Sequence, residues 1–139
     1  MLLAAPLHLL IILVAAGGFL IASHIRRKKL KNEALVCPLN SNCEAVIHSQ
    51  YSRFLGLPLE LLGMIYYAFT AFNHLLFLIL PAFNSGEIVA VVMAMSVMAA
   101  LFSFYLTYIQ AAKLREWCTW CLISALFCSI IFLASLALL

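Results

Sequence analysis

Long apolar runs separated by short polar segments dominate the pattern of this chain. Four runs, at about residues 2–23, 58–80, 88–109 and 117–139, are each long enough to cross the hydrocarbon core of a bilayer as a helix, which takes about 20 residues. The last two runs contain no charged residue. The pattern therefore predicts an all-α membrane protein, in which residues 1–139 form a single four-transmembrane-helix bundle.

Composition supports a membrane location and excludes some classes of function. Of the 139 residues, 67% are apolar and 9% are charged, and the mean hydropathy is +1.14, values outside the range of a soluble domain. The first run has no basic segment before it and is too long for the apolar part of a signal peptide, so we expect it to be retained. Too little polar chain remains to hold a nucleotide, and we expect no nucleic-acid partner.

The connections divide the chain between two unlike sides of the membrane. Because four spans alternate in direction, the first connection (residues 24–57) and the third share a side, whereas both termini and the second connection lie opposite. Lys and Arg in short connections are retained in the cytoplasm, which predicts a multi-pass cell-membrane protein with both termini outside. The alternative is the reverse orientation, with the first side facing outward. The basic residues all belong to this first side: Arg26, Arg27, Lys28, Lys29, Lys31, Arg53, Lys113 and Arg115.

Four of the five cysteines lie on the same side as the basic residues, and two of them begin the last span. The spacing of three in "CTWC" puts Cys118 and Cys121 on one face of a helix. The partial positive charge of a helix N-terminus stabilises a thiolate, and a thiolate is the species that attacks a disulfide. The pair therefore indicates thiol–disulfide exchange. The alternative is two small apolar residues in a helix interface.

A second pair, Cys37 and Cys43, lies in the first connection in the segment "CPLNSNC". Its Pro, Asn and Ser residues favour turns, so we expect a mobile dithiol that meets external thiols and passes electrons to the helix pair. A structural loop disulfide is one alternative. A four-cysteine metal site is another, but zinc knuckles usually lie in compact soluble turns, and we expect no metal. The fifth cysteine, Cys128, has no partner in the sequence and is expected to pack between helices.

Electrons that reach a dithiol at the membrane need an acceptor. The chain has neither a haem-attachment C-x-x-C-H motif nor the glycines of a dinucleotide site. We therefore expect a lipid quinone of the ubiquinone or menaquinone type. A hydrophobic cleft lined by Met and by aromatic residues such as Tyr66, Tyr67 and Phe102 would hold it, although such residues also form plain bundle cores.

The order of these motifs resembles the vitamin K epoxide reductase family over almost the whole chain. The resemblance comprises C-x5-C in the loop, Ser49 six residues after the second cysteine, "FLGLPLELLGMIYY", and "CTWC" heading the last span. It implies a quinone-linked thiol–disulfide oxidoreductase that supports protein disulfide formation. Carried over by position, Cys121 contacts the quinone, Cys118 exchanges with Cys43, and Cys37 meets a thioredoxin-like partner.

The resemblance also implies further site residues. Ser49 matches the serine of a short helix that caps the active site, and Gly56, Pro58 and Gly63 match the turn into the second span and its close packing. Many microbial relatives carry a fused thioredoxin-like domain after the bundle; since this sequence ends at Leu139, we expect a partner in trans. The implied quinone pocket comprises Ser49, Leu59, Leu62, Tyr66 and Ala125.

Two positions depart from the vertebrate members, which hold the quinone carbonyls with an Asn on the second span and a Tyr four residues after the C-x-x-C. The aligned residues here are Leu59 and Ala125, and neither side chain donates a hydrogen bond. We therefore expect plain quinone reduction rather than epoxide reduction. Glu60, the one carboxylate inside a predicted span, is expected either to reach the lipid headgroups or to supply a proton to the quinone.

Two other functions remain open. A membrane transporter of soft metals would carry Met or His ligands inside the spans, and His74, near the far end of the second span, is one candidate. A structural subunit would use a Cys37–Cys43 disulfide only to staple its loop. The inward orientation predicted by charge is found in archaeal members of the resembled family, whereas most bacterial members face outward.

Overall fold

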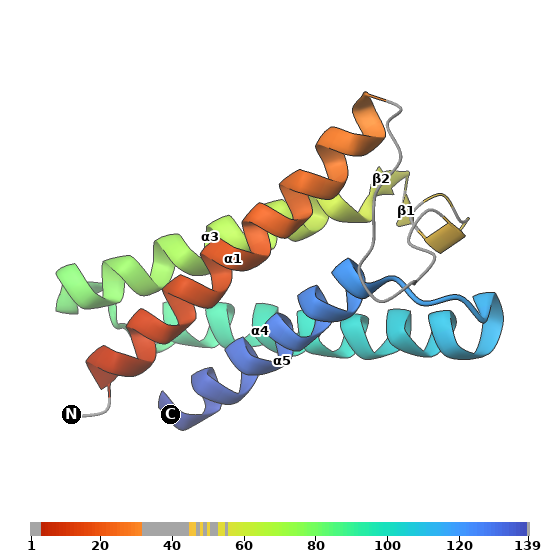
Figure 1. Cartoon of the computed structure of the whole chain (residues 1–139). Coiled ribbons are helices and arrows are strands. Elements are labelled where there is room, and N and C mark those ends of the chain that lie inside the picture. Colours follow the sequence, from red (N-terminus) through yellow and green to blue (C-terminus); the bar gives the residue numbers. More distant parts are fainter. Residues whose placement is uncertain are drawn as a thin grey trace.

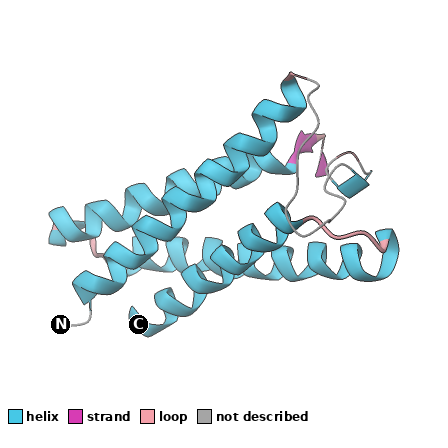
Figure 2. Ribbon diagram, viewed as in Figure 1, coloured by secondary structure: helices cyan, strands magenta, loops and turns pink. Residues whose placement is uncertain are grey.

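The computed structural model consists of four long helices and a short hairpin. The helices are α1 (Ala4–Leu30), α3 (Leu59–Ile79), α4 (Gly86–Tyr108) and α5 (Thr119–Leu138). Helices dominate the described chain (Figure 2), and these four are long and apolar enough to cross a membrane. The predicted all-α four-helix membrane bundle is thereby confirmed. The structure describes residues 4–31, 45–46, 48, 50, 53–54 and 56–138, so Cys37, Cys43 and Ser49 lie outside the described residues.

The helices pack as two crossing pairs with both termini at one end. Helix α1 packs along α3, and α5 packs against both α1 and α4. In Figure 1 the two termini lie at the end of the bundle opposite the hairpin. The core between the pairs contains the fully buried side chains of Ile11, Tyr67 and Ile131. The Tyr67 ring lies over Gly18 so closely that a Cβ at this glycine would come within 2.4 Å of ring carbons.

Helix α1 continues beyond the apolar run that predicted it. The run ends near Ser23, but the helix ends at Leu30 and includes the basic cluster of Arg26 to Lys29. Arg and Lys are good helix formers, so the end of the apolar run marks the edge of the membrane and not the end of the helix. The predicted loop over residues 24–57 is therefore helical in its first part.

Short elements connect the long helices. Strands β1 (Arg53–Phe54) and β2 (Leu57–Pro58) pair antiparallel, with Phe54 opposite Leu57, and the turn between them includes Gly56 at φ +82°, a conformation that favours glycine. The 3-10 helix η3 (Pro81–Phe83) joins α3 to α4. Helix α4 passes into the π-helix η4 (Ile109–Leu114), after which Arg115 adopts a left-handed conformation at φ 53°.

Candidate functional site

The C-x-x-C motif forms the beginning of α5. Cys118 directly precedes the helix, and its carbonyl oxygen accepts the first helical hydrogen bond, from the N–H of Leu122 at 2.9 Å. The backbone N–H of Cys121 donates to Cys118 Sγ at 3.2 Å. The sulfur of Cys118 thus acts as the acceptor that caps the helix N-terminus. Because the two cysteines are three residues apart, the N–H group that it accepts from is that of Cys121, the third residue of the helix.

This position favours ionisation of Cys118. A hydrogen bond from the Cys121 thiol lowers the pKa of the Cys118 thiol below its ordinary value, and the backbone N–H groups of Cys121 and Trp120 act in the same direction. Burial opposes them but does not cancel them. Because the thiolate is the reactive form of cysteine, these hydrogen bonds increase the fraction of Cys118 that is in its reactive form.

Gln110 is a site residue that the sequence reasoning missed. Its side chain is 4% exposed, and its Oε1 atom accepts a hydrogen bond from the backbone N–H of Cys118 at 2.9 Å. Gln110 belongs to η4, and π-helical turns are frequent at functional sites. The available signal was a lone amide in an apolar helix, eight residues before the first cysteine of the motif.

Cys118 and Cys121 face different surroundings. Cys118 is fully buried, and Ile21, Val46 and Trp120 pack against the cluster that it forms with Ile25. Cys121 is part of the wall of a cavity of about 470 Å³, a size typical of ligand pockets. The two thiols are unpaired in this structure.

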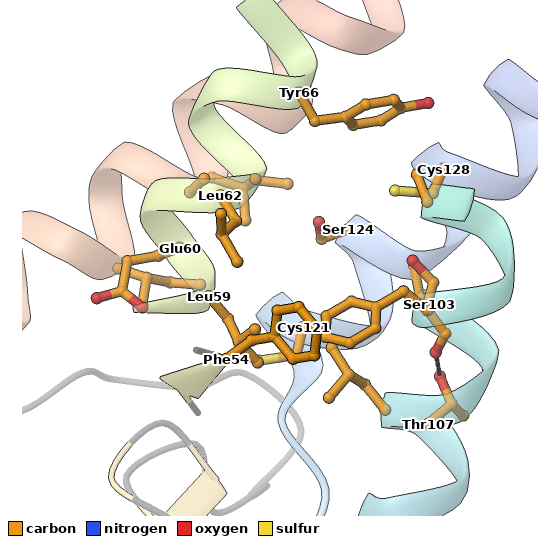
Figure 3. Close-up of a pocket in the computed structure, with 18 of the residues that line it drawn as sticks. Phe54, Leu59, Glu60, Leu62, Tyr66, Ser103, Thr107, Cys121, Ser124 and Cys128 are labelled. Atoms are coloured by element: carbon orange, nitrogen blue, oxygen red, sulfur yellow. Dashed lines mark hydrogen bonds between the residues drawn. The ribbon is translucent and has the colours of Figure 1, made fainter. Parts of the chain in front are cut away.

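The cavity brings together most of the pocket residues inferred from the sequence. Helices α3, α4 and α5 supply most of its wall, with contributions from α1 and the hairpin. Figure 3 shows Phe54 and Cys121 toward one end, and Tyr66 and Cys128 toward the other. Phe54 also contacts Phe102 edge-to-face, with ring centroids 5.3 Å apart. The wall contains Leu59, Leu62, Tyr66, Ala125 and Cys121, as well as Tyr67, Met95, Met98 and Phe102.

Two adjacent tyrosines in the cavity wall differ in their hydrogen bonding. The Tyr67 hydroxyl donates to the carbonyl oxygen of Ser124 at 2.9 Å and contacts Ser124 Oγ at 2.7 Å and Cys128 Sγ at 3.3 Å. It thereby joins α3 to α5. The buried Tyr66 hydroxyl lies near Ser96, but it forms a well-oriented hydrogen bond to no group in the described part of the chain. Tyr66 therefore has a donor available inside the cavity.

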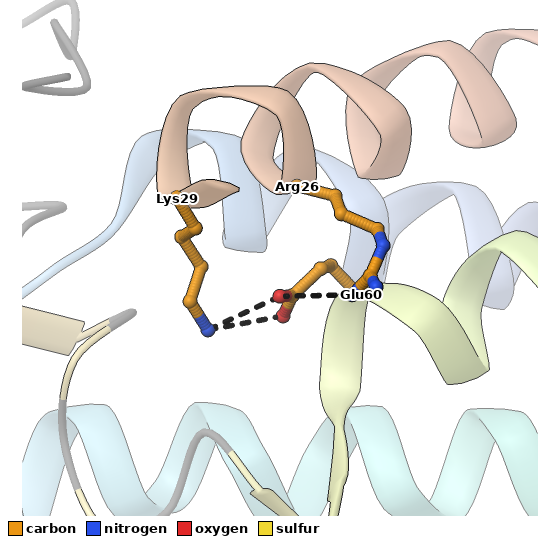
Figure 4. A network of polar contacts seen from close by, with 3 residues as sticks. All are labelled: Arg26, Lys29 and Glu60. Carbon is orange, nitrogen blue, oxygen red and sulfur yellow. Dashed lines mark hydrogen bonds and ion pairs between the residues drawn. The ribbon is translucent and has the colours of Figure 1, made fainter. Parts of the chain in front are cut away.

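Glu60, in the first turn of α3, pairs with two basic residues of α1. Its side chain is 7% exposed and its carboxylate oxygens lie 3.1 and 3.3 Å from Lys29 Nζ, with Arg26 at 3.9 Å. Figure 4 shows both cations reaching from α1 to the carboxylate. Because a buried carboxylate is costly without partners, this network explains why an acid is tolerated here.

The remaining sequence-predicted site residues divide into two groups. Cys37, Cys43 and Ser49 lie outside the described residues. Cys128 is 6% exposed in the core, as predicted for packing, and it also contacts Tyr67 at the cavity wall.

A comparison with protein families gives a match over nearly the whole chain. The model described as "Vitamin K epoxide reductase family" matches residues 9–136, nearly the entire chain. The matched region includes most of all four long helices, the first connection and both cysteine pairs.

Proposed function

The chain belongs to the vitamin K epoxide reductase family, whose members are membrane oxidoreductases, and we propose that it oxidises a thioredoxin-like protein in trans and passes the electrons to a membrane quinone. The observation that carries this proposal is the placement of Cys121 in the wall of an apolar cavity while Cys118, beside it, has a lowered pKa. One thiol of the pair therefore faces a site for an apolar acceptor, and the other is activated for exchange.

The proposed relay has two exchange steps. Cys37 and Cys43 receive electrons from the partner's dithiol, which leaves as a disulfide. The Cys43 thiolate then attacks Cys118 of a Cys118–Cys121 disulfide, forming a Cys43–Cys118 bond and releasing Cys121 as a thiolate. Attack by Cys37 on Cys43 closes the loop disulfide and releases Cys118.

The packing around Cys118 supports its role as the exchanging residue. Val46 packs against the cluster that contains Cys118, and it follows Cys43 by three residues. Cys118 is absent from the cavity wall, which leaves Cys121 as the cysteine of the motif that faces the acceptor.

The cavity fits a quinone headgroup by its size, its apolar wall and the unpaired hydroxyl of Tyr66. The Cys118–Cys121 dithiol would supply the two electrons and two protons that convert a quinone into a quinol, and would itself become a disulfide. Tyr66 has an unpartnered hydroxyl that can donate to a carbonyl oxygen, a role that Leu59 and Ala125 cannot fill. We therefore assign Tyr66 as the anchoring donor, and plain quinone reduction as the reaction.

The site is proposed to face the cytoplasm. The basic residues of α1 and of the third connection lie at the cysteine end of the bundle, and such charges stay on the cytoplasmic side. Both termini would then be outside. A reporter fused at the C-terminus should read as external; a cytoplasmic reading would instead assign an outward-facing active site.

Reduction of a short-chain quinone by the purified protein tests the function. With dithiothreitol as the electron donor, C118S and C121S should each abolish quinol formation, whereas C37S and C43S should retain it, because a small dithiol reaches the helix pair without the loop. Cys128→Ser is the matched control, since Cys128 lies in the same wall but outside the relay. Activity that survives C121S would refute the proposal, and loss of this activity in C37S would refute the shuttle role of the loop.

A further inference from the structure

A pair of histidines meets at the end of the bundle opposite the cysteines. His8 on α1 and His74 on α3 bring their Nδ1 atoms to 2.9 Å, with ring centroids 5.1 Å apart. The His74 side chain is buried at 2% exposure, and the Phe77 ring lies against both imidazoles. Among the described residues neither imidazole has a carboxylate partner, so the contact is that of two neutral rings, one of which donates its Nδ1–H to the Nδ1 atom of the other.

A second cavity adjoins this pair. Its volume is about 110 Å³, which is more than one water molecule requires. Two buried polar atoms at its wall, His74 Nε2 and Ser135 Oγ, have no hydrogen-bond partner among the described residues. Unpaired polar atoms in an apolar bundle are unfavourable. These two atoms are therefore free to interact with a ligand that enters the cavity. The wall also contains Met93, a residue with a soft thioether.

The donor set restricts which ion would fit. Zinc sites use four ligands, or three with water, but no group of three or more His, Cys, Asp and Glu side chains gathers anywhere in the described chain. Without a carboxylate or thiolate, the site has no negative charge to offset a divalent ion. Imidazole and thioether donors suit copper, and soft ligands select its monovalent form. A monovalent soft cation is therefore the best match.

We propose that His8 and His74 form a Cu(I) site at this end of the bundle. The ion replaces the proton between the two Nδ1 atoms. Metal–imidazole bonds of about 2 Å require the nitrogens to move from 2.9 Å to about 4 Å apart, and the adjoining cavity gives the rings room for this. The proton that the donating ring carried on Nδ1 moves to Nε2 of the same ring, so binding releases no proton and involves no electron transfer. This site is independent of the proposed quinone chemistry.

Competition for Cu(I) against a chromogenic chelator tests the site. Thiolates would dominate binding, so the measurement uses a variant with all five cysteines replaced by Ser, compared with the same variant carrying His8→Ala or His74→Gln. One Cu(I) per chain is expected, and either substitution should weaken binding by more than about 100-fold, since loss of a ligand exceeds loss of a supporting contact. His24→Ala, at the other end of α1, is the matched control and should leave binding unchanged. Binding that is absent, or equal after His8→Ala, would overturn the proposal.

A second measurement needs no substitution that could disturb folding. In the ¹⁵N-histidine-labelled wild-type chain, Ag(I) serves as a redox-inert substitute for Cu(I), added beyond the capacity of the thiols. The Nδ1 resonances of His8 and His74 should shift and show coupling to silver, while those of His24 stay in place. Unchanged Nδ1 resonances of the pair would show that it is only a packing contact.

Discussion

The side-chain Oε1 of Gln110 accepts a hydrogen bond from the backbone N–H of Cys118 at 2.9 Å, across the reversal between the third and fourth membrane helices. Neither residue is exposed, with Gln110 at 4% and Cys118 at 0%. The contact fixes the backbone at the point where α5 begins. It therefore also fixes the position of Cys118 Sγ, and the hydrogen bonds to this sulfur lower the pKa of the Cys118 thiol. A residue outside the C-x-x-C motif thus orients the first cysteine of that motif.

Gln110→Leu should weaken both stability and the activation of Cys118. The substitution leaves the buried N–H of Cys118 without a partner, which costs about 1–3 kcal/mol in the free energy of unfolding. Gln110→Glu retains an acceptor oxygen but adds an anion, so it should raise the pKa of Cys118. Asn73→Ala is the matched control, because the Asn73 amide donates to the carbonyl oxygen of Phe69 in its own helix and, among the described residues, links no other element. Equal thermal melting of wild type and Gln110→Leu would contradict the assigned role.

The reactivity of Cys118 should depend on pH with a midpoint below that of an ordinary thiol. Hydrogen bonds from Cys121 and the helix N-terminus favour the thiolate, so the rate of alkylation should rise at lower pH than in the unfolded chain, where the pKa is about 8.5. Cys121→Ala removes the largest cause and should move the midpoint upward. Peptide mass spectrometry after timed quenching gives the rate for Cys118 alone. A midpoint at or above that of the unfolded chain would show that burial prevails.

Substitutions at the two adjacent tyrosines should have different effects. Tyr66→Phe removes an unpartnered donor from the cavity, so KM for the quinone should rise about fivefold to tenfold, the equivalent of one hydrogen bond, with kcat little changed. Tyr67→Phe removes the link from α3 to Ser124 and Cys128, and should lower stability by about 1–2 kcal/mol. Steady-state kinetics and thermal melting of both variants separate the two roles, and a rise in KM confined to Tyr67→Phe would reverse the assignment.

Gly18 should tolerate no side chain. A Cβ there would lie 2.4 Å from carbons of the Tyr67 ring, so Gly18→Ala should force α1 away from α3 and cost about 1–3 kcal/mol. Gly63→Ala is the matched control, since its added Cβ would meet Ala22 at 3.7 Å, an ordinary contact. Thermal melting in detergent measures both changes. Equal melting temperatures for the two variants would mean that the Tyr67 ring moves aside at little cost.

The sequence predicts the helices and the reactive motif because both depend on local features. Each apolar run must span the bilayer, and its length therefore reports a membrane helix; the two cysteines of "CTWC" are three residues apart, and their common face follows from helix geometry. Hydropathy marks where a helix leaves the membrane but gives no signal for where it ends in water. The extension of α1 to Leu30 therefore could not be predicted from it.

Contacts between distant segments could not be read from the sequence. The pairing of His8 with His74 depends on the register of α1 against α3, and no local pattern specifies it. The contact of Gln110 with Cys118 depends on a π-helical turn followed by a left-handed Arg115, and an arginine gives no signal for that conformation. The Glu60–Lys29 ion pair similarly requires the helical continuation of α1 beyond its apolar run.

The central claim is that Cys118 exchanges with the loop while Cys121 faces the acceptor. Trapping of the exchange intermediate tests this claim most directly. In the C121S variant Cys118 can open the loop disulfide at Cys43, but the Cys121 thiol that would then displace Cys43 is gone. A Cys43–Cys118 disulfide, which Cys37 alone can reopen, should therefore accumulate. Acid quenching followed by peptide mass spectrometry identifies the linked peptides. The account predicts the Cys43–Cys118 crosslink in C121S and its absence in C118S. A Cys43–Cys121 crosslink in C118S, with none in C121S, would contradict it.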